Sequence, residues 1–389
     1  MTPFFINNLI NGVFLFLLCT RNLQSTEGQI VLSGDDNEVS GEFSTVAGGF
    51  GNNATDPYSF VGGGYFNDAT GDYSFVGGGL GNNATEKYSF VGGGIGNDAT
   101  GASSTVSGGF NNIASGDEST IGGGDSNIAS GSTSTIGGGE INVAADVDAT
   151  VSGGFNNIAS SEASTIGGGD SNVAAGEGST VSGGFENSAS SDGSTIGGGN
   201  QNEASGFGST VSGGFENIAI SGGSTIGGGG GNVAAGLGST VSGGKDNNAT
   251  GAFSFIGGGE NNQATGNNSI AMGRNANAKK DRSLVINLGN NEASSKKDGE
   301  FLVNSDSFTL QIGKKKVTIN KKNIKRFKKL LKKKNRRLEE IPNQYEINEY
   351  VNQQQTIIEE LHKQNEKQQE QINELNRMMN NFIAQSSSE

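Results

Sequence analysis

The chain has 389 residues, of which 67 are glycine and three are proline, and it contains no tryptophan. Only 32% of its residues are hydrophobic, which excludes a pair of ordinary globular domains with large apolar cores. The net charge of −14 is unevenly spread. Residues 30–273 carry 24 acidic and two basic residues, whereas residues 314–337 carry 14 basic and no acidic ones. The sequence therefore predicts an acidic body followed by a basic segment.

Residues 1–27 have the features of a secretion signal. The apolar run LINGVFLFLLC, from Leu9 to Cys19, has the length of a signal core and is too short to span a bilayer. No Lys or Arg precedes the run and no clear small-residue cleavage site follows it, so a signal anchor or a buried apolar stub is the alternative. Cys19 is the only cysteine, which excludes an intrachain disulfide and a cysteine-based metal site.

A phrase of fifteen residues then recurs along the chain. We number each copy from the Val or Ile of its STV-like or STI-like segment, which is position 0. Gly fills positions +2 and +3, Asn fills +6 and Ala fills +8 in every copy, while Ser fills −2 in all copies except the one with Ala149. Self-similarity at so short a period is the signature of a solenoid. The residues at position 0 are Val46, Val61, Val76, Val91, Val106, Ile121, Ile136, Val151, Ile166, Val181, Ile196, Val211, Ile226, Val241 and Ile256.

We expect an all-β solenoid, because fifteen residues are too few for a helix hairpin but enough for two strands of about four residues and two tight turns. Alternate residues of a strand share a face, so positions −2, 0, +6 and +8 are predicted to point inward, with the Asn amides stacked along the axis. The glycine pair supplies the backbone freedom of a turn. The predicted structural ladder is represented by Val46, Asn52, Ala54, Val151, Asn157, Ala159, Ile256, Asn262 and Ala264.

Both ends of the repeat region are atypical. Residues 28–45 keep part of the frame without the glycine pair, so we expect a capping coil there. Downstream, Asn277 keeps the frame and Ser283 arrives one residue early. The predicted roll therefore covers residues 46–290.

A single copy of this roll has little to bury. Each coil encloses one branched aliphatic side chain and one methyl group, about 2 to 4 kcal/mol of apolar burial, against an ordering cost of about 1 to 2 kcal/mol per residue. We therefore expect copies of the same chain to cover the outer face of one strand. Position −1 suits such a shared face, because it is Thr in most copies and Phe60, Phe75, Phe90 or Phe255 in four others.

The segment NNSIAMGRNANA, from Asn267 to Ala278, together with the recurring N-x-A-[TS]-G and S-x-[VI]-x-G phrases, resembles the head repeat of trimeric autotransporter adhesins. The resemblance covers about residues 29–290 and implies a left-handed parallel β-roll, trimerisation and a surface-exposed adhesive fibre. Two features depart from the family: a Gly-Gly pair replaces a single Gly in most coils, and the sequence ends in the polar AQSSSE instead of membrane-barrel strands. We therefore expect a head-like protein without the C-terminal membrane anchor of that family.

Residues 291–320 are predicted to form a small β connector, because FLVNSDSFTLQIGKKKVTIN alternates like two short strands around a Gly-Lys turn. Residues 321–340 are predicted to form a basic amphipathic neck helix, with Ile324, Phe327 and Leu331 on one face. The basic residues between 314 and 337 suit contact with an anionic surface. The alternative is a solvated start to a coiled coil, and nucleic acid is disfavoured because only one aromatic residue accompanies the basic run.

Residues 341–389 fit the heptads of a coiled-coil stalk. Polar residues at some core positions fix the register, and β-branched residues at a with Leu at d favour two strands by themselves, so the expectation of a trimer comes from the roll. The predicted coiled-coil core contains Ile347, Val351, Ile358, Leu361, Asn365, Ile372, Leu375 and Met379.

No catalytic or cofactor-binding constellation is recognisable in the sequence. His362 is the only histidine and falls on the flank of the predicted coiled coil, so neither a Ser-His-Asp nor a Cys-His arrangement can be built around it. We expect a non-enzymatic, secreted or surface-displayed homotrimeric fibre that mediates attachment to a host-surface or matrix ligand and needs no cofactor or metal. The alternatives are a structural spacer without a specific ligand and an ice- or mineral-binding solenoid with a Thr row.

Overall fold

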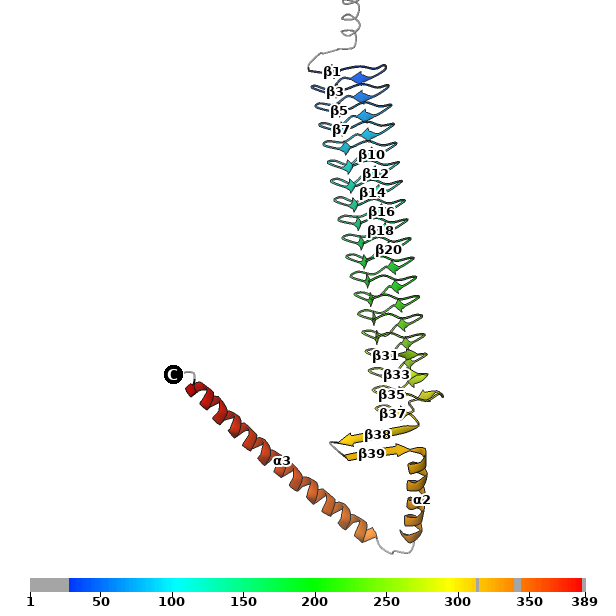
Figure 1. Cartoon of the computed structure of the whole chain (residues 1–389), viewed down its shortest axis with the longest axis vertical. Helices are drawn as coiled ribbons and strands as arrows, with labels where there is room; N and C mark the ends of the chain where they lie inside the picture. Colours follow the sequence, from blue (N-terminus) through cyan, green and yellow to red (C-terminus); the bar gives the residue numbers. More distant parts are fainter. Residues whose placement is uncertain (1–27, 313–314, 339–343, 387–389) are drawn as a thin grey trace, which may run out of the picture. The chain divides into compact units, whose positions relative to one another are not determined.

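A computed structural model describes residues 28–312, 315–338 and 344–386. The signal-like segment 1–27 lies outside these residues. The chain divides between Asp306 and Ser307 into two units. The first unit is a stack of coils (Figure 1). Each coil supplies one strand to each of two sheets, and the strands within each sheet are parallel. This observation confirms the prediction of an all-β solenoid with parallel strands.

Sheet A contains nineteen strands, which carry the odd numbers. They are β1 (Ile30–Val31), β3 (Thr45–Val46), β5 (Phe60–Val61), β7 (Phe75–Val76), β9 (Phe90–Val91), β11 (Thr105–Val106), β13 (Thr120–Ile121), β15 (Thr135–Ile136), β17 (Thr150–Val151), β19 (Thr165–Ile166), β21 (Thr180–Val181), β23 (Thr195–Ile196), β25 (Thr210–Val211), β27 (Thr225–Ile226), β29 (Thr240–Val241), β31 (Phe255–Glu260), β33 (Ile270–Arg274), β35 (Leu284–Asn287) and β37 (Phe301–Asn304).

Sheet B is built from the even-numbered strands of the same coils. They are β2 (Glu38–Val39), β4 (Asn53–Ala54), β6 (Asp68–Ala69), β8 (Asn83–Ala84), β10 (Asp98–Ala99), β12 (Ile113–Ala114), β14 (Ile128–Ala129), β16 (Val143–Ala144), β18 (Ile158–Ala159), β20 (Val173–Ala174), β22 (Ser188–Ala189), β24 (Glu203–Ala204), β26 (Ile218–Ala219), β28 (Val233–Ala234), β30 (Asn248–Ala249), β32 (Gln263–Ala264), β34 (Ala276–Ala278) and β36 (Ala293–Ser294).

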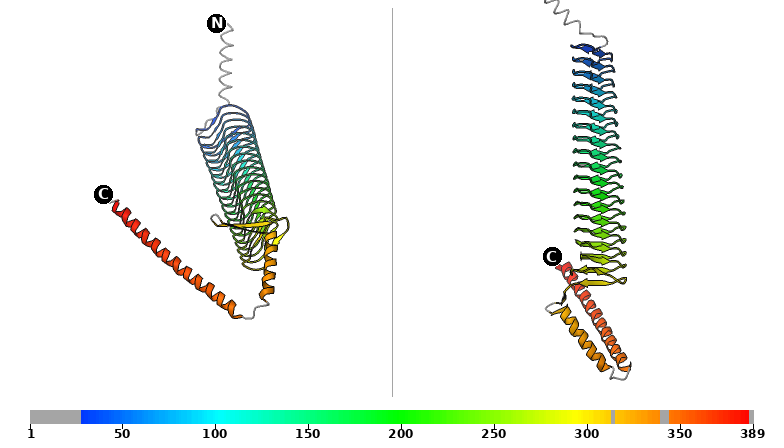
Figure 2. Two further views of the ribbon diagram at one scale, coloured as in Figure 1. Left: turned by 60° about the horizontal axis from the view of Figure 1, so that its bottom comes forward. Right: turned by 90° about the vertical axis from the view of Figure 1, so that its right-hand side faces the viewer.

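The strands of successive coils pair in register at a spacing of fifteen residues. In sheet A, Thr150 lies opposite Thr165, and in sheet B, Ala144 lies opposite Ala159. Each coil donates backbone hydrogen bonds to the next, as Thr150 N does to the carbonyl oxygen of Ser164 at 2.9 Å. Seen from the side, the strands of each sheet form an even ladder (Figure 2). Equivalent side chains therefore stack above one another along the whole rod.

Most strands are only two residues long, which is shorter than the expected four. The reason is the sharpness of the corners, since each coil reverses twice through residues with positive φ. In the coil around Val151, these corner residues are Gly154 (φ 95°), Asn156 (φ 52°) and Ala163 (φ 54°). At Gly154 a side chain is also excluded, because a Cβ there would lie 2.2 Å from the carbonyl oxygen of Gly169. Glycine at +3 is therefore required by both backbone conformation and close packing.

The first unit has a narrow interior filled by four side chains per coil. Positions 0 and +8 supply the apolar part, and position −2 and position +6 supply Ser and Asn. Almost all of these residues in the described coils are completely buried. The interior of the described coils therefore consists of rows of equivalent buried side chains.

The frame changes near the C-terminal end of the roll, earlier than the sequence suggested. The pairing between β31 and β33 slips by one residue after Ile256, so Gly259 lies opposite Gly273, fourteen residues away. Ala276, and not Asn277, then continues the buried Asn row, because its N–H donates to Asn262 Oδ1 at 2.9 Å. Asn277 lies instead opposite Gln263 on sheet B. The physical cause is a turn one residue shorter, with AMGR (271–274) where the previous coil has IGGGE (256–260).

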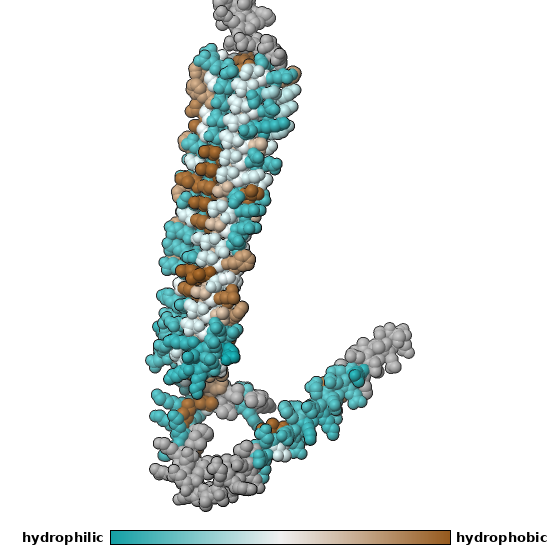
Figure 3. Space-filling view, turned by 180° about the vertical axis from the view of Figure 1, so that it is seen from behind, coloured by the Kyte–Doolittle hydropathy of each residue, from teal (hydrophilic) through white to brown (hydrophobic). Residues whose placement is uncertain are grey.

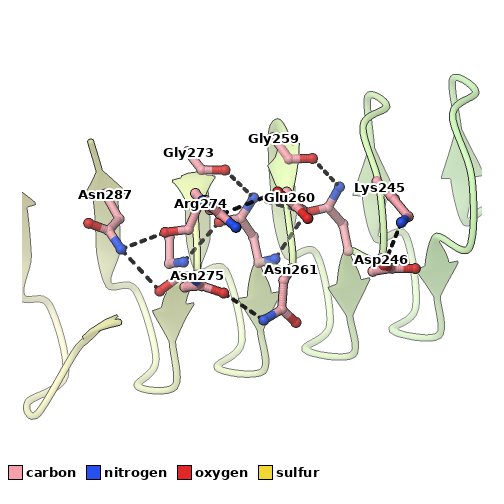
Figure 4. Close-up of polar contacts among 12 residues, drawn as sticks. Lys245, Asp246, Gly259, Glu260, Asn261, Gly273, Arg274, Asn275 and Asn287 are labelled. Atoms are coloured by element: carbon pink, nitrogen blue, oxygen red, sulfur yellow. Dashed lines mark hydrogen bonds and ion pairs between the residues drawn. The ribbon is translucent and has the colours of Figure 1, made fainter. Parts of the chain in front are cut away.

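Polar side chains link the coils where the frame changes. Figure 4 shows Arg274 paired with Glu260, with its Nε 3.2 Å from Glu260 Oε2, and Asn261 donating to Asn275. The roll then continues past the expected boundary at residue 290, because β36 and β37 extend both sheets after a coil of seventeen residues. The segment Phe301–Asn304, which was expected to start a separate connector, is therefore a strand of sheet A.

The second unit contains a hairpin and two helices. Strands β38 (Ser307–Ile312) and β39 (Lys315–Asn320) pair antiparallel. They are followed by α2 (Lys321–Leu338) and α3 (Gln344–Ser386). No helix within the described residues combines the length and apolar character needed to cross a membrane.

Candidate binding surface

The predicted ladder residues lie in the interior of the roll. Val46, Ala54 and Asn52, their counterparts Val151, Ala159 and Asn157, and Ile256, Ala264 and Asn262 are all 0% exposed. Such residues are not accessible to a ligand in the folded rod.

The buried Asn row is a continuous chain of hydrogen bonds. The Nδ2 of Asn157 donates to Asn142 Oδ1 at 3.1 Å and to the carbonyl oxygens of Gly153 and Gly169 at 3.0 and 2.9 Å. Its Oδ1 accepts from the backbone N–H and the side-chain amide of Asn172. Each coil needs a side chain here that can both donate and accept hydrogen bonds, which explains why Asn recurs at position +6.

Surface chemistry is carried by the outward rows. At position −1, the rings of Phe60, Phe75 and Phe90 stack with centroids 5.1 and 5.0 Å apart. At position −3, the rings of Phe43, Tyr58, Tyr73 and Tyr88 form a second stack. The repeat pattern identified the Phe residues at position −1 but not the aromatic residues at position −3, although the latter also recur every fifteen residues.

A third row runs along the outer corner at position +4, and we call it the outer row. Its large apolar members within the described coils are more than a third exposed, and each forms a parallel bridge with the residue in the next coil. Figure 3 shows apolar side chains gathered in patches along the length of the rod. Scattered apolar residues on a surface are ordinary, whereas the unbroken part of the outer row, from Phe50 to Phe110, forms an extended apolar surface. The large apolar members of the outer row are Phe50, Tyr65, Leu80, Ile95, Phe110, Phe155, Phe185 and Phe215.

Acidic residues alternate with the aromatic ones in the middle of the outer row. Asp125 and Glu140 occupy neighbouring coils, whereas Phe155 separates Glu140 from Asp170. Within the described residues, no group of three or more His, Cys, Asp or Glu side chains has the geometry of a metal site.

On sheet B, burial raises the pKa of Asp68, and a hydrogen bond from Asn53 opposes this shift.

In the second unit, the apolar positions predicted for a coiled coil are exposed in the single chain. Ile358, Leu361, Ile372 and Leu375 are each more than half exposed on α3, and Asn365 is exposed as well. The side chains of Ile347, Val351 and Met379 lie outside the described residues. His362 is also exposed on this helix. These residues give α3 an exposed apolar stripe.

Four segments of the chain match the family model described as the Ubiquitous surface protein adhesin repeat: residues 104–116, 149–160, 179–190 and 209–222. Each match covers one coil from its sheet A strand to its sheet B strand and contains one Phe of the outer row. A comparison with curated proteins found no match. The chain is thus similar, in these coils, to the repeats of adhesin-type surface proteins, and these repeats form a β-solenoid.

Proposed function

We propose that this protein is a non-enzymatic, homotrimeric fibre on a cell or virion surface, or secreted, which attaches to a host-surface or matrix ligand. The observation that carries this proposal is the outer row, because its exposed Phe residues lie in the coils that match adhesin repeats. The roll acts as the binding head and needs no cofactor.

Two observations support self-association. The exposed apolar residues of α3, such as Leu361 and Leu375, require a partner of the same kind to be covered, which a coiled coil supplies. In the head, the stacked Phe60, Phe75 and Phe90 form a flat apolar strip on sheet A that suits contact with another copy. Three copies are proposed because of the resemblance to trimeric adhesins.

The remaining segments serve display in this proposal. Residues 1–27 direct export, residues 28–45 cap the roll, and the helix within residues 321–340 forms a basic neck before the stalk at 341–389. The exposed Lys and Arg side chains of α2 are available for an anionic surface.

Sedimentation equilibrium of the full chain tests the assembly. We expect the mass of three copies, and we expect a variant with Leu361→Asp and Ile372→Asp to dissociate at a higher protein concentration than the wild type, because charges would enter the helix seam and leave only the head contacts. The control Glu359→Gln lies outside the seam and should leave the trimer intact. A wild-type protein that sediments as a monomer would contradict the trimeric fibre.

A binding assay tests the attachment function separately. Trimers are applied to a surface coated with basement-membrane extract, and bound protein is measured. A variant with Phe155→Ser, Phe185→Ser and Phe215→Ser should bind at least ten-fold less, while the control Asn200→Ser in the same row should bind like the wild type. Undiminished binding of the triple variant would refute the role of the outer row, and no binding by any form would favour the structural spacer.

A further inference from the structure

The stack at position −3 brings three tyrosines of successive coils together on the surface. The ring centroids of Tyr58 and Tyr73 are 4.7 Å apart with an interplanar angle of 4°, and those of Tyr73 and Tyr88 are 5.3 Å apart at 26°. The three side chains are 45%, 48% and 53% exposed. The rings are therefore accessible from solvent, and each ring has a phenol neighbour at contact distance.

The backbone holds these rings in a conformation that tyrosine rarely adopts. Tyr58, Tyr73 and Tyr88 have φ of 61°, 58° and 62°. Later coils of the rod use Gly at the same corner, for example Gly178 and Gly193, with almost the same φ. Other coils have Ser103, Glu118 or Thr133 at this corner with similar φ, so the backbone does not require tyrosine there.

We propose that the Tyr58–Tyr73 pair is a site of oxidative cross-linking, which forms a dityrosine bond between two successive coils of one chain. This inference is independent of the proposed attachment function. The pair is favoured over Tyr73–Tyr88 because its rings are closer and nearly parallel. In addition, the Lys87 ammonium lies 5.0 Å from the ring centroid of Tyr88, and a cation beside a ring disfavours the removal of an electron from it.

The oxidant is hydrogen peroxide acting through a haem peroxidase. Each phenol loses one electron and its hydroxyl proton, which gives two phenoxyl radicals on adjacent rings. One carbon–carbon bond forms between the two ortho carbons, and the hydrogen on each of these carbons then moves to the phenol oxygen of its own ring. Two hydrogen atoms are lost overall, and one peroxide is reduced to two waters.

The bond would fasten two coils that are otherwise held by hydrogen bonds and stacking. Register favours it, because parallel strands in adjacent coils keep equivalent side chains one strand spacing apart, about 4.8 Å. Tyr65 provides a matched comparison in the same coils. It is more exposed, at 59%, but its row neighbours are Phe50 and Leu80, so it has no phenol beside it.

The full chain is treated with a haem peroxidase and peroxide, and dityrosine is measured by its fluorescence and by mass spectrometry of the digested protein. We expect a cross-link between the peptides containing Tyr58 and Tyr73, with a loss of two hydrogens. Cross-linked chains should run at the monomer mass on a denaturing gel. The variant Tyr73→Phe should form at least ten-fold less dityrosine, whereas Tyr65→Phe should form as much as the wild type.

Folding is not expected to confound this result, because Phe already occupies the same corner at Phe43 and Phe253, and the melting temperature of each variant checks it. The double variant with Tyr58→Phe and Tyr88→Phe leaves Tyr73 without a phenol neighbour and should show the same loss. Three results would overturn the proposal: full dityrosine yield in Tyr73→Phe, an equal loss in Tyr65→Phe, or cross-links found only between separate chains.

Discussion

Replacement of one Asn in the buried row tests how the interior is held together. In Asn157→Ala, the backbone N–H of Asn172 loses its acceptor, and the carbonyl oxygens of Gly153 and Gly169 each lose a donor. The carbonyl oxygen of Gly169 keeps its bond from Phe155 N at 2.9 Å, so the N–H of Asn172 is the main unsatisfied group. An orphaned buried donor costs about 1 to 3 kcal/mol, and each lost hydrogen bond about 0.5 to 1.5 kcal/mol.

We therefore expect Asn157→Ala to lower the free energy of unfolding by about 3 kcal/mol or more. Urea unfolding followed by circular dichroism measures this change, and the transition should broaden or split because coils of a solenoid interact only with their neighbours. The control Ser160→Ala changes an outward residue whose counterparts in the adjacent coils are Ala145 and Ala175, and it should change stability by less than about 0.5 kcal/mol. A loss below about 1 kcal/mol in Asn157→Ala would refute the importance of the amide row.

Three further changes probe the corners, the apolar row and the charge on sheet B. Gly154→Ala should destabilise the rod by about 3 kcal/mol or more, because the residue has φ 95° and the new Cβ would lie 2.2 Å from a carbonyl oxygen. In the control Gly153→Ala, the new Cβ would meet no atom closer than 3.8 Å. Equal melting temperatures of the two variants would contradict the packing argument. Ile166→Ala should cost about 2 to 5 kcal/mol in urea unfolding and Thr165→Ala much less, since only Ile166 is fully buried. Burial raises the pKa of the Asp68 carboxyl above its ordinary value of 3.8. The contribution of Asp68 to the free energy of unfolding is therefore greatest below pH 3.8 and declines as the pH rises through the raised pKa. Asp68→Asn should therefore raise the melting temperature at pH 7 and not at a pH well below 3.8, and an equal effect at both pH values would contradict the raised pKa.

Much of the fold follows from the period of the sequence. A strict fifteen-residue spacing, with Gly at fixed offsets, leaves a solenoid as the only regular structure that stacks equivalent residues such as Thr150 and Thr165. Strand length was harder to predict, because it depends on corner residues such as Asn156 and Ala163 that adopt positive φ without a distinctive sequence signal. The end of the roll was missed because the period changes there: one turn residue is absent after Ala271, which gives the place of the buried Asn to Ala276, and the next coil has seventeen residues.

The candidate surface was less predictable than the interior. Inward positions are limited to one or two residue types, so they are recognisable in the repeat, whereas positions of the outer row vary between Phe, acidic residues and Gly. The tyrosine stack shows this limit. Tyr58, Tyr73 and Tyr88 differ from their equivalents in later coils, and only the stacking of coils shows that the three rings touch.

The in-register stacking of coils can be measured most directly with paired cysteines in a Cys19→Ser background. Thr150→Cys with Thr165→Cys places the two residues opposite each other in adjacent strands, at a Cα separation of about 4.8 Å, which a disulfide spans. Thr150→Cys with Thr180→Cys places them two coils apart, at about twice that distance, which is too far. On mild oxidation, we expect an intrachain disulfide in the first pair and none in the second. A disulfide in the second pair, with none in the first, would contradict a rod of stacked fifteen-residue coils.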